Sequence, residues 1–419
     1  MLSINKIYGW LFVFALLIQI PSVHLFKFTD EILVVFMMSL VFLDVVLNKQ
    51  YKKYKMLWAI MGVMAFYMIY SLVFVSYNTP KAILQDFVAQ IKPFCYFFIS
   101  YSIAPRLSER TKQIVRWVCV FNISAVVICF VLGLVETVFM HVAYLGLVSI
   151  VSAICYLLCS IDADNKVSRK DLCTVVVMLL IGLVSTRSKY YGELVLSLYL
   201  LFFYVPGVIK KIKLKHIIVM AVMSILVLIV AWTKIDYYFI SGGQEDMLYD
   251  EDVIESFARP VMYASMFVVL SMYPLFGSGL ASFGTYASAT NYSRLYAEIG
   301  IDNVFGLSED YGNFICDAFY PELAQFGLVG IVLFVAFFLW VNKRLALFLY
   351  LNGKILYVAG LMAIIVLLIE SVASTVLNQG AGAMCMMILG YLVSTVKHLD
   401  KNVAKMAYKE KGALEYIRK

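Results

Sequence analysis

The chain has 419 residues, of which 63% are hydrophobic and 15% are charged, and its formal net charge is +7 at pH 7. A soluble domain is roughly half apolar and about a quarter charged, so this composition excludes an ordinary water-soluble enzyme. Apolar runs of about 18 or more residues recur along the whole chain, and each is long enough to cross a bilayer as a helix.

The first apolar run, residues 7–20, follows Lys6 and has the outline of a secretion signal. No small-x-small cleavage site comes after it, because the chain continues Pro-Ser-Val-His. We therefore expect a retained first membrane span rather than a removed leader.

Hydropathy predicts an all-α, polytopic integral membrane protein with about twelve transmembrane helices and one long extracytoplasmic loop. The predicted spans cover residues 7–24, 31–47, 56–76, 82–104, 114–132, 138–160, 172–186, 190–209, 216–233, 319–342, 354–372 and 378–396. The fourth contains Pro93 and begins with the amphipathic stretch "KAILQDFVAQIK", which favours a short interfacial helix joined to a short span. This organisation gives nine spans in residues 1–233, a loop over 234–318, three spans in 319–396 and a basic tail over 397–419.

Basic residues alternate between the predicted loops in a way that sets their orientation. Cytoplasmic loops carry the Lys and Arg excess, and with both termini inside, 26 of the 34 basic residues lie on the cytoplasmic side. The eight on the outer side are Lys27, Lys81, Lys92, Arg187, Lys189, Lys234, Arg259 and Arg294. We therefore expect functional chemistry on the outer face, where the long loop also lies.

Cysteine and histidine give little indication of metal or disulfide chemistry. Seven of the eight cysteines fall inside or at the ends of predicted spans, and only Cys316 lies in the long loop. The four histidines are scattered, so no Cys/His cluster has metal-ligand spacing. We expect neither a disulfide framework nor a bound metal.

The stretch "STRSKYYGE", residues 185–193, places Arg187 and Lys189 in a tight outer connection, against the positive-inside pattern. One interpretation is an anion site, in which Arg offers a planar bidentate fork and Lys a point charge. The alternatives are that these cations snorkel to lipid headgroups or pair with Glu193.

In the long loop, the acidic run at residues 244–255 lacks the glycine and the spacing of a calcium-binding loop, so a solvated loop is expected. Pro260 suits a first helical turn, which predicts a short interfacial or re-entrant helix over 259–273 with Arg259 at its N-cap. An anion bound at that helix N-terminus would explain the Arg. A packed helix with an incidental Arg is the alternative.

Glycines and acids follow that helix. Gly277 and Gly279 could cradle a phosphate or simply allow a tight turn and close packing. The loop aromatics Tyr286, Tyr292, Tyr296, Phe305, Tyr311, Phe314 and Tyr320 suit stacking on sugars or anchoring at the interface. Asp317 and Glu322 stand at the start of the tenth span, where each also suits a helix N-terminus.

The order of these features resembles the bacterial O-antigen ligase/polymerase family, and most of all its O-antigen and capsular polysaccharide polymerases. The similar stretches are "LVSTRSKYYGELVLSL", "ARPVMYASMFVVLSMYPLFGSGLASFG" and "DAFYPELAQFGLVG", with the long loop after the first. The family's basic stretch falls on Arg187 and Lys189, its loop Arg on Arg259, and its His/Asp region on Asp317. Ligase members carry His-Asn where this chain has Cys316-Asp317, which favours a polymerase.

The resemblance implies a metal-independent glycosyltransferase that works without a cofactor at the outer face of the bacterial cytoplasmic membrane. A growing glycan on undecaprenyl pyrophosphate is the donor, and the hydroxyl of a lipid-linked repeat unit attacks its anomeric carbon. Arg187, Lys189 and Arg259 would stabilise the leaving pyrophosphate. The expected partners are these lipid-linked oligosaccharides, the bilayer and a chain-length regulator protein, with no nucleic acid.

A carboxylate would take the acceptor proton, and Asp317 is our candidate for this general base. Its rivals and the residues expected to support the site are Glu309, Asp310, Glu322, Glu193, Arg294, Gly277 and Gly279. Two other functions stay open: a ligase with a different acceptor, and a glycolipid flippase or transporter. Transporters place ionisable groups near the midplane and often contain repeats, whereas this sequence has no internal repeat and few charges within its spans.

Overall fold

A computed structural model describes residues 4–21, 29–162, 165–203, 251–351 and 353–397, together with three isolated positions between 204 and 250. All regular secondary structure in these residues is helical. The predicted ninth span at 216–233, the basic loop 210–215, the acidic run up to residue 250 and the tail beyond Lys397 lie outside the described residues.

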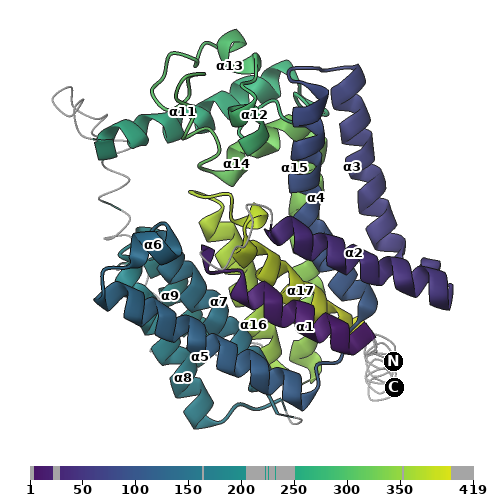
Figure 1. The fold of residues 1–419 in the computed structure, drawn as a ribbon, viewed down its shortest axis with the longest axis vertical. Helices are drawn as coiled ribbons and strands as arrows, with labels where there is room; N and C mark the ends of the chain where they lie inside the picture. The colour runs from purple at the N-terminus through teal and green to yellow at the C-terminus, as the bar shows by residue number, and fades with distance from the viewer. Residues whose placement is uncertain are drawn as a thin grey trace, which may run out of the picture.

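Each predicted span within the described residues overlaps a helix (Figure 1). The long helices are α1 (Ile4–Leu17), α2 (Thr29–Asn48), α3 (Lys55–Val73), α4 (Pro80–Ile103), α5 (Glu109–Val131), α7 (Ala143–Cys159), α8 (Arg169–Ile181), α9 (Ser188–Phe203), α11 (Glu251–Met272), α15 (Gly327–Leu345), α16 (Lys354–Glu370) and α17 (Gly380–Lys397). Short α-helices are α6 (Val135–Phe139), α12 (Tyr286–Thr290), α13 (Leu295–Glu298) and α14 (Phe319–Glu322). Short 3₁₀ helices cover Tyr51–Tyr54, Gly182–Ser185, Leu323–Phe326, Ala346–Leu351 and Val376–Asn378.

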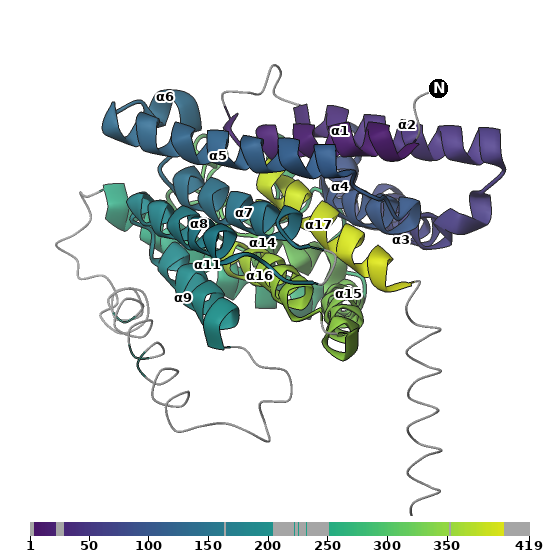
Figure 2. The same ribbon diagram turned by 90° about the horizontal axis from the view of Figure 1, so that it is seen from below.

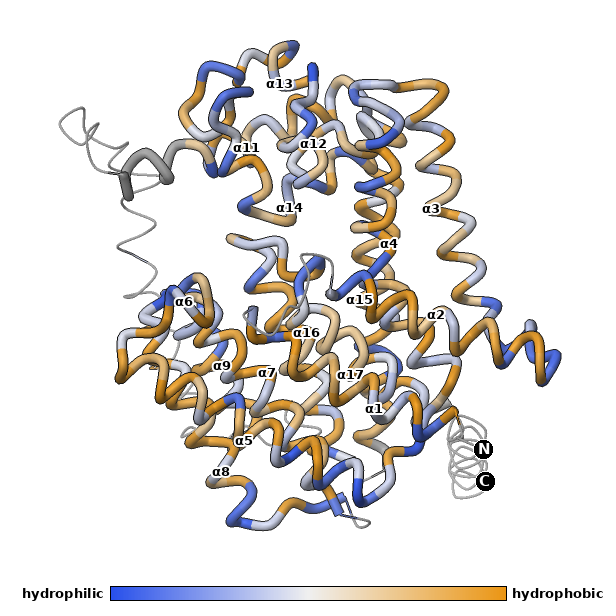
Figure 3. Tube along the Cα trace, viewed as in Figure 1, coloured by the Kyte–Doolittle hydropathy of each residue, from blue (hydrophilic) through white to orange (hydrophobic). Residues whose placement is uncertain are grey.

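Three of the described helical stretches are long and apolar enough to cross a membrane by length and composition: Tyr51–Val73, Glu109–Val131 and Phe319–Leu349. Four shorter apolar helices accompany them, at Ile4–Leu17, Ala143–Cys159, Ala258–Met272 and Gly380–Val396. Large apolar side chains are exposed along α2, α5 and α15, for example Phe42, Trp117 and Leu339, and Figure 3 shows how much of the bundle is apolar. These features indicate a membrane protein, while the twelve-span count stays a prediction.

Helix α17 lies at the centre of the bundle and packs against α4, α16 and α1. Its residues 384–389 are completely buried. A Cβ at Gly390 would lie 2.3 Å from the Phe97 carbonyl oxygen, so this glycine permits close approach of α17 to α4. Gly380 at the start of α17 touches Ile18 just beyond α1, so these two helices run antiparallel, as Figure 2 also shows.

Helix α4 corrects one expectation. It runs without a break from Pro80 to Ile103, so the interfacial helix and the short span that we expected are one continuous helix. Thr79 accepts a hydrogen bond from the backbone N–H of Ala82, and Pro80 occupies the first turn. Pro93 inside the helix removes one backbone hydrogen bond, which neighbouring helices can offset.

Residues 251–322, which we call the cap, sit at one end of the bundle (Figure 1). The cap has a small core of its own, formed by Ala258, Met262, Val269, Phe283, Leu295, Tyr296, Ile301, Leu307 and Ile315, with Ala324 just beyond it. Most of the predicted long loop is therefore a packed structure that can hold side chains in fixed positions.

The predicted start of the cap helix is wrong. Helix α11 begins at Glu251 and continues through Pro260, so Arg259 lies inside the helix and is not its N-cap. The residues before Pro260 can form a helix. A Pro inside a helix removes one backbone hydrogen bond, and the turn before it can stay helical. An anion held by free N–H groups at residue 259 is therefore excluded.

Candidate functional site

The glycine turn, residues 274–284, attaches the cap to the bundle. Gly277 has φ +73°, and a Cβ there would lie 2.4 Å from both the Ala324 carbonyl oxygen and the Gly327 nitrogen. The Gly279 N–H donates to the Gln325 carbonyl at 3.0 Å. These contacts are with backbone atoms of the next segment, which assigns Gly277 and Gly279 to close packing.

Buried polar side chains of α4 form hydrogen bonds that hold the glycine turn and Glu322 in place. Asp86 accepts a hydrogen bond from the Ala281 N–H at 2.7 Å. The Gln90 amide donates to Asp86 at 3.3 Å and to Glu322 at 2.9 Å. All three side chains are buried, so Glu322, a rival candidate for the general base, is tied into the link between cap and bundle.

The cap is also fixed to the end of α16. The Tyr263 hydroxyl donates to the Val372 carbonyl at 2.8 Å, and the Tyr320 hydroxyl donates to the Leu368 carbonyl at 2.7 Å. The Phe319 N–H donates to the Ser371 carbonyl at 3.1 Å. These bonds bring Arg259 and Asp317 beside the segment that follows α16.

Arg259 and Asp317 form an ion pair in which the guanidinium Nη2 donates to Asp317 Oδ2. The side chains are 25% and 33% exposed, and Arg259 Nε has no partner among the described residues. Asp317 does not cap α14, because the N-cap is Ala318 and no side chain caps that helix. The capping interpretation of Asp317 is therefore wrong, and the pair combines residues that the sequence had singled out separately.

Lys189, at the start of α9, pairs with Glu370 at the end of α16, with 2.5 Å between Nζ and Oε2. Lys189 Nζ also lies 3.5 Å from the Ala373 carbonyl, and the Ser374 hydroxyl donates to Glu370 Oε2 at 3.1 Å. Glu370 is buried with its side chain only 4% exposed. The sequence left open an ion pair between these cations and Glu193, and none is present among the described residues.

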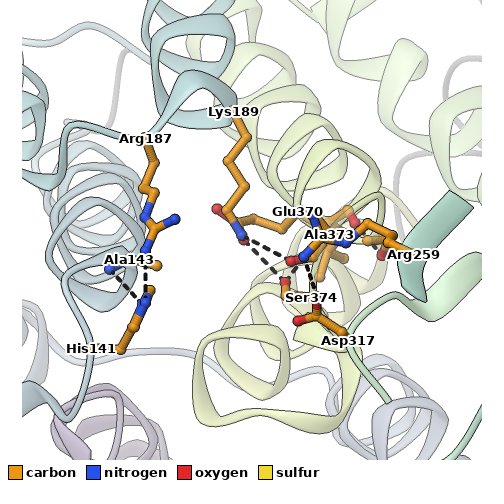
Figure 4. A network of polar contacts seen from close by, with 11 residues as sticks. His141, Ala143, Arg187, Lys189, Arg259, Asp317, Glu370, Ala373 and Ser374 are labelled. Carbon is orange, nitrogen blue, oxygen red and sulfur yellow. Dashed lines mark hydrogen bonds and ion pairs between the residues drawn. The ribbon is translucent and has the colours of Figure 1, made fainter. Parts of the chain in front are cut away.

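Arg187 lies against His141, with 2.7 Å between the guanidinium Nη2 and imidazole Nε2 (Figure 4). His141 stands in the turn between α6 and α7, and its Nδ1 accepts a hydrogen bond from the Ala143 N–H at 3.1 Å. Both side chains are exposed. Arg187 is the one cation of the three that makes no ion pair with a carboxylate among the described residues.

These three pairs lie near one another, and we call their six residues the charged cluster: His141, Arg187, Lys189, Arg259, Asp317 and Glu370 (Figure 4). Partial burial lowers the pKa of His141, and the charges of Arg187 and Lys189 lower it further, whereas Asp317 opposes the shift. The imidazole therefore faces both cations and the acid, and it stays neutral to lower pH than an ordinary histidine.

Glu193 lies on α9, one turn after Lys189, and is completely buried. Its carboxyl group interacts electrostatically with Glu370 and Lys189, and it forms no ion pair within the described residues. The expected supporting role of Glu193 stays a prediction.

Three other candidates lie elsewhere on the cap. Arg294 donates to the Ser76 carbonyl at 3.2 Å, and Glu309 and Asp310 are exposed. Within the described residues, none of the three forms an ion pair or a side-chain hydrogen bond with a member of the charged cluster.

Sequence reasoning missed two members of the charged cluster. Glu370 is the only Asp, Glu, Lys, Arg or His residue between Lys354 and Lys397. An isolated charged residue in apolar helices is a signal of function. His141 carried no such signal, because it stands alone between two apolar stretches. Only the fold brings it to Arg187.

No protein-family model matches the chain, and no curated protein matches it in sequence. Within the described residues, no three His, Cys, Asp or Glu side chains are placed to share a metal ion. The site must therefore be interpreted from its own geometry.

Proposed function

We propose that the protein is a polysaccharide polymerase of the cytoplasmic membrane that transfers a glycan from undecaprenyl pyrophosphate to a lipid-linked repeat unit. One observation carries the proposal. Arg187 just before α9 and Lys189 at its start lie close to Arg259 from α11 and Asp317 before α14, although the three segments are far apart in sequence. These are the positions on which the resemblance to the polymerases rests.

The chemistry of the proposed reaction suits this set of side chains. The acceptor hydroxyl attacks the anomeric carbon, the bond to the lipid pyrophosphate breaks, and the pyrophosphate leaves as an anion. Its developing charge needs cations more than it needs a proton, and Arg187, Lys189 and Arg259 supply them. Asp317 Oδ2 meets Arg259, which leaves Oδ1 to accept the proton of the attacking hydroxyl.

The proposal also explains why the charges of the cluster are only partly compensated. Lys189 and Arg259 each have one carboxylate partner, but their side chains are 19% and 25% exposed. Arg259 Nε is buried and has no hydrogen-bond partner among the described residues. A cluster built only for stability would gain from complete pairing, because an unpaired donor next to the membrane interior is costly.

The test is a product assay with purified full-length protein and defined lipid-linked repeat units. A ladder of glycans that grows by whole repeats on the lipid is the expected result. Transfer of the glycan to a different lipid acceptor, with no ladder, would replace the polymerase with a ligase. Absence of any new glycosidic bond would overturn both.

A second candidate function is transport of a lipid-linked oligosaccharide, and one observation favours it. The sequence argument against a transporter relied on few charges within the spans, yet Asp30, Asp86, Lys92, Glu193 and Glu370 are all buried in the bundle. Buried ionisable groups in membrane helices often mark transport pathways.

Most of these groups have structural partners, which weakens the transporter interpretation. Lys92 pairs with Asp30 and Glu31, and Asp86 holds the glycine turn. Glu193 is the exception. Movement of a fluorescent lipid-linked oligosaccharide between leaflets, with loss of movement in Glu193→Gln and no chain extension in wild type, would select the transporter.

A further inference from the structure

The contact between His141 and Arg187 contains an unresolved conflict of hydrogen-bond donors. A neutral imidazole has one N–H and one acceptor nitrogen, and a guanidinium has donors only. His141 Nδ1 receives the Ala143 N–H at 3.1 Å, while Nε2 faces Arg187 Nη2 at 2.7 Å. Both ring nitrogens therefore face donors, and no neutral tautomer can accept from both.

The backbone contact decides which nitrogen carries the proton. Ala143 is the first residue of α7, so its N–H has a fixed position and no helical acceptor. Nδ1 is then the acceptor, and the proton lies on Nε2. This places the Nε2–H of His141 against the Nη2–H of Arg187, two donors directed at the same space.

An oxygen between the two donors resolves the conflict. It would accept one hydrogen bond from His141 Nε2–H and one from Arg187, each with a normal length of about 2.8–3.0 Å after the exposed Arg side chain moves aside. Because Arg187 has no carboxylate partner among the described residues, an anionic oxygen would also compensate its charge.

The backbone on both sides is held in uncommon conformations that present this pair. Met140, just before His141, has φ +61°, and Thr186, just before Arg187, has φ +50°. Neither residue is glycine, so each turn carries strain that the surrounding structure maintains. Two strained turns from different parts of the chain thus direct two donors toward one point.

We propose that His141 Nε2–H and Arg187 together bind one oxygen of a phosphate group, so that His141 is a phosphate-binding residue of the charged cluster. The assignment to phosphate rests on the proposed function, in which the donor lipid carries a diphosphate. A phosphate headgroup of the bilayer has the same chemistry and is the other source of such an oxygen.

The test measures binding of inorganic pyrophosphate by calorimetry to the full-length protein in phosphatidylcholine nanodiscs near pH 7.5. His141→Asn keeps an acceptor near the Ala143 N–H but lacks a donor at the Nε2 position, whereas His141→Gln can place its amide N–H there. A hydrogen bond to a charged group contributes about 1.5–3 kcal/mol, so His141→Asn should weaken binding by about 10-fold or more. His141→Gln should stay close to wild type.

Arg294→Ala is the matched control, because it removes one Arg from the cap at a position that contacts Ser76 instead of the charged cluster. It should bind pyrophosphate as wild type does, while Arg187→Ala should lose as much affinity as His141→Asn or more. Wild-type affinity in His141→Asn overturns the proposal. So does the absence of pyrophosphate binding to the wild-type protein.

If His141→Asn does not fold, ¹⁵N-histidine spectra of the wild-type protein supply the readout. The signal that disappears in His141→Gln is that of His141; a proton on Nε2, with a shift change on adding pyrophosphate, supports the proposal, and a proton on Nδ1 overturns it. Nanodiscs that contain phosphatidylglycerol separate the two sources of phosphate. If the wild-type protein binds pyrophosphate more weakly in these nanodiscs, and His141→Asn shows no such difference between the two lipids, the site binds a lipid headgroup. If the wild-type protein binds pyrophosphate equally well in both, the site binds the lipid-linked diphosphate.

The binding assay contains no glycan, so its outcome is independent of chain extension. If pyrophosphate binding depends on His141 but the protein extends no glycan, the phosphate site stands and the polymerase proposal fails. If the wild-type protein extends chains but His141→Asn binds pyrophosphate normally, the polymerase proposal stands and the phosphate site fails.

Discussion

The glycine turn and the charged cluster both consist of groups that stand out in the sequence, but the structure uses them in opposite ways. Around the glycine turn, Asp86, Gln90 and Glu322 are buried and bonded to each other or to backbone. In the charged cluster, Arg187 and His141 are exposed and lie 2.7 Å apart. The first arrangement fixes the cap, and the second is the one that we propose binds a ligand.

The comparison teaches that pairing and exposure, rather than residue type, separate the structural polar groups from those that we propose to be functional. Glu322 and Asp317 are five positions apart, and the sequence offered Asp317 as the candidate base with Glu322 as a rival. Glu322 is 1% exposed and hydrogen-bonded to Gln90, whereas Asp317 is 33% exposed on its side chain and paired with Arg259. Only Asp317 can meet a substrate without unfolding the cap.

The largest expected effect is on the glycine turn. Gly277→Ala places a methyl group 2.4 Å from backbone atoms of residues 324 and 327, at a φ of +73° that L-residues rarely adopt. We expect a loss of more than about 4 kcal/mol in stability, enough to prevent accumulation of folded protein. Protein levels in membranes and thermal unfolding in detergent measure it.

Gly62→Ala is the control, because Gly62 lies within α3 and nothing approaches a Cβ there within 4 Å. It should be neutral or stabilise by about 0.5–1 kcal/mol. A Gly277→Ala protein that melts with the wild type would contradict the structural role of the turn.

The next effect concerns Asp317 and should appear in rate rather than stability. Asp317→Asn keeps the size of the side chain but cannot accept a proton, so chain extension should fall by about 10²–10⁴-fold. Because Asp317 is not a helix cap and its ion pair is partly exposed, melting should change little in either Asp317→Asn or Asp317→Ala. An active Asn variant would remove Asp317 from the mechanism.

The smallest effect is a pH dependence that belongs to His141. Partial burial, Arg187 and Lys189 lower its pKa in the folded protein below the ordinary value of about 6.5, against the pull of Asp317. As the pH falls through about 6.5, His141 takes up its proton in the unfolded chain before it does so in the folded protein. This uptake favours the unfolded chain, so the His141 contribution to stability falls as the pH falls and rises as the pH rises across that window.

Melting temperatures of wild type and His141→Gln, compared from about pH 5 to about pH 8, isolate this contribution. The wild type should lose more stability on the acid side than the Gln variant does. Equal losses in the two proteins would show that His141 does not face the cations as described.

Helix positions were predictable from the sequence because apolar runs of membrane length carry a strong signal. Within the described residues, ten of the eleven apolar stretches predicted outside 216–233 overlap helices with only shifted ends or short breaks, as at α6 and α7, while their number as membrane spans stays a prediction. The fourth differed because Pro93 does not interrupt α4. The start of α11 was misplaced for the same reason: a Pro inside a helix resembles a Pro in its first turn.

The candidate site was predictable only in part. Arg187, Lys189 and Arg259 stood out because they violate the expected distribution of basic residues, and Asp317 because of its place before a span. Their partners His141 and Glu370 come from distant segments, and no local pattern encodes which segments meet. The pairing of Arg259 with Asp317 likewise depends on how the cap packs on the end of α16.

The most direct measurement of the account is the glycan ladder made from defined lipid-linked repeat units by purified wild type, Arg187→Ala, Arg259→Ala and the control Arg294→Ala. Loss of one donor aimed at developing charge costs about 10²–10³ in rate, so the ladder should vanish for Arg187→Ala and Arg259→Ala at normal protein levels and persist for wild type and Arg294→Ala. Full-length ladders from both Arg187→Ala and Arg259→Ala would contradict the charged cluster as the site of the reaction.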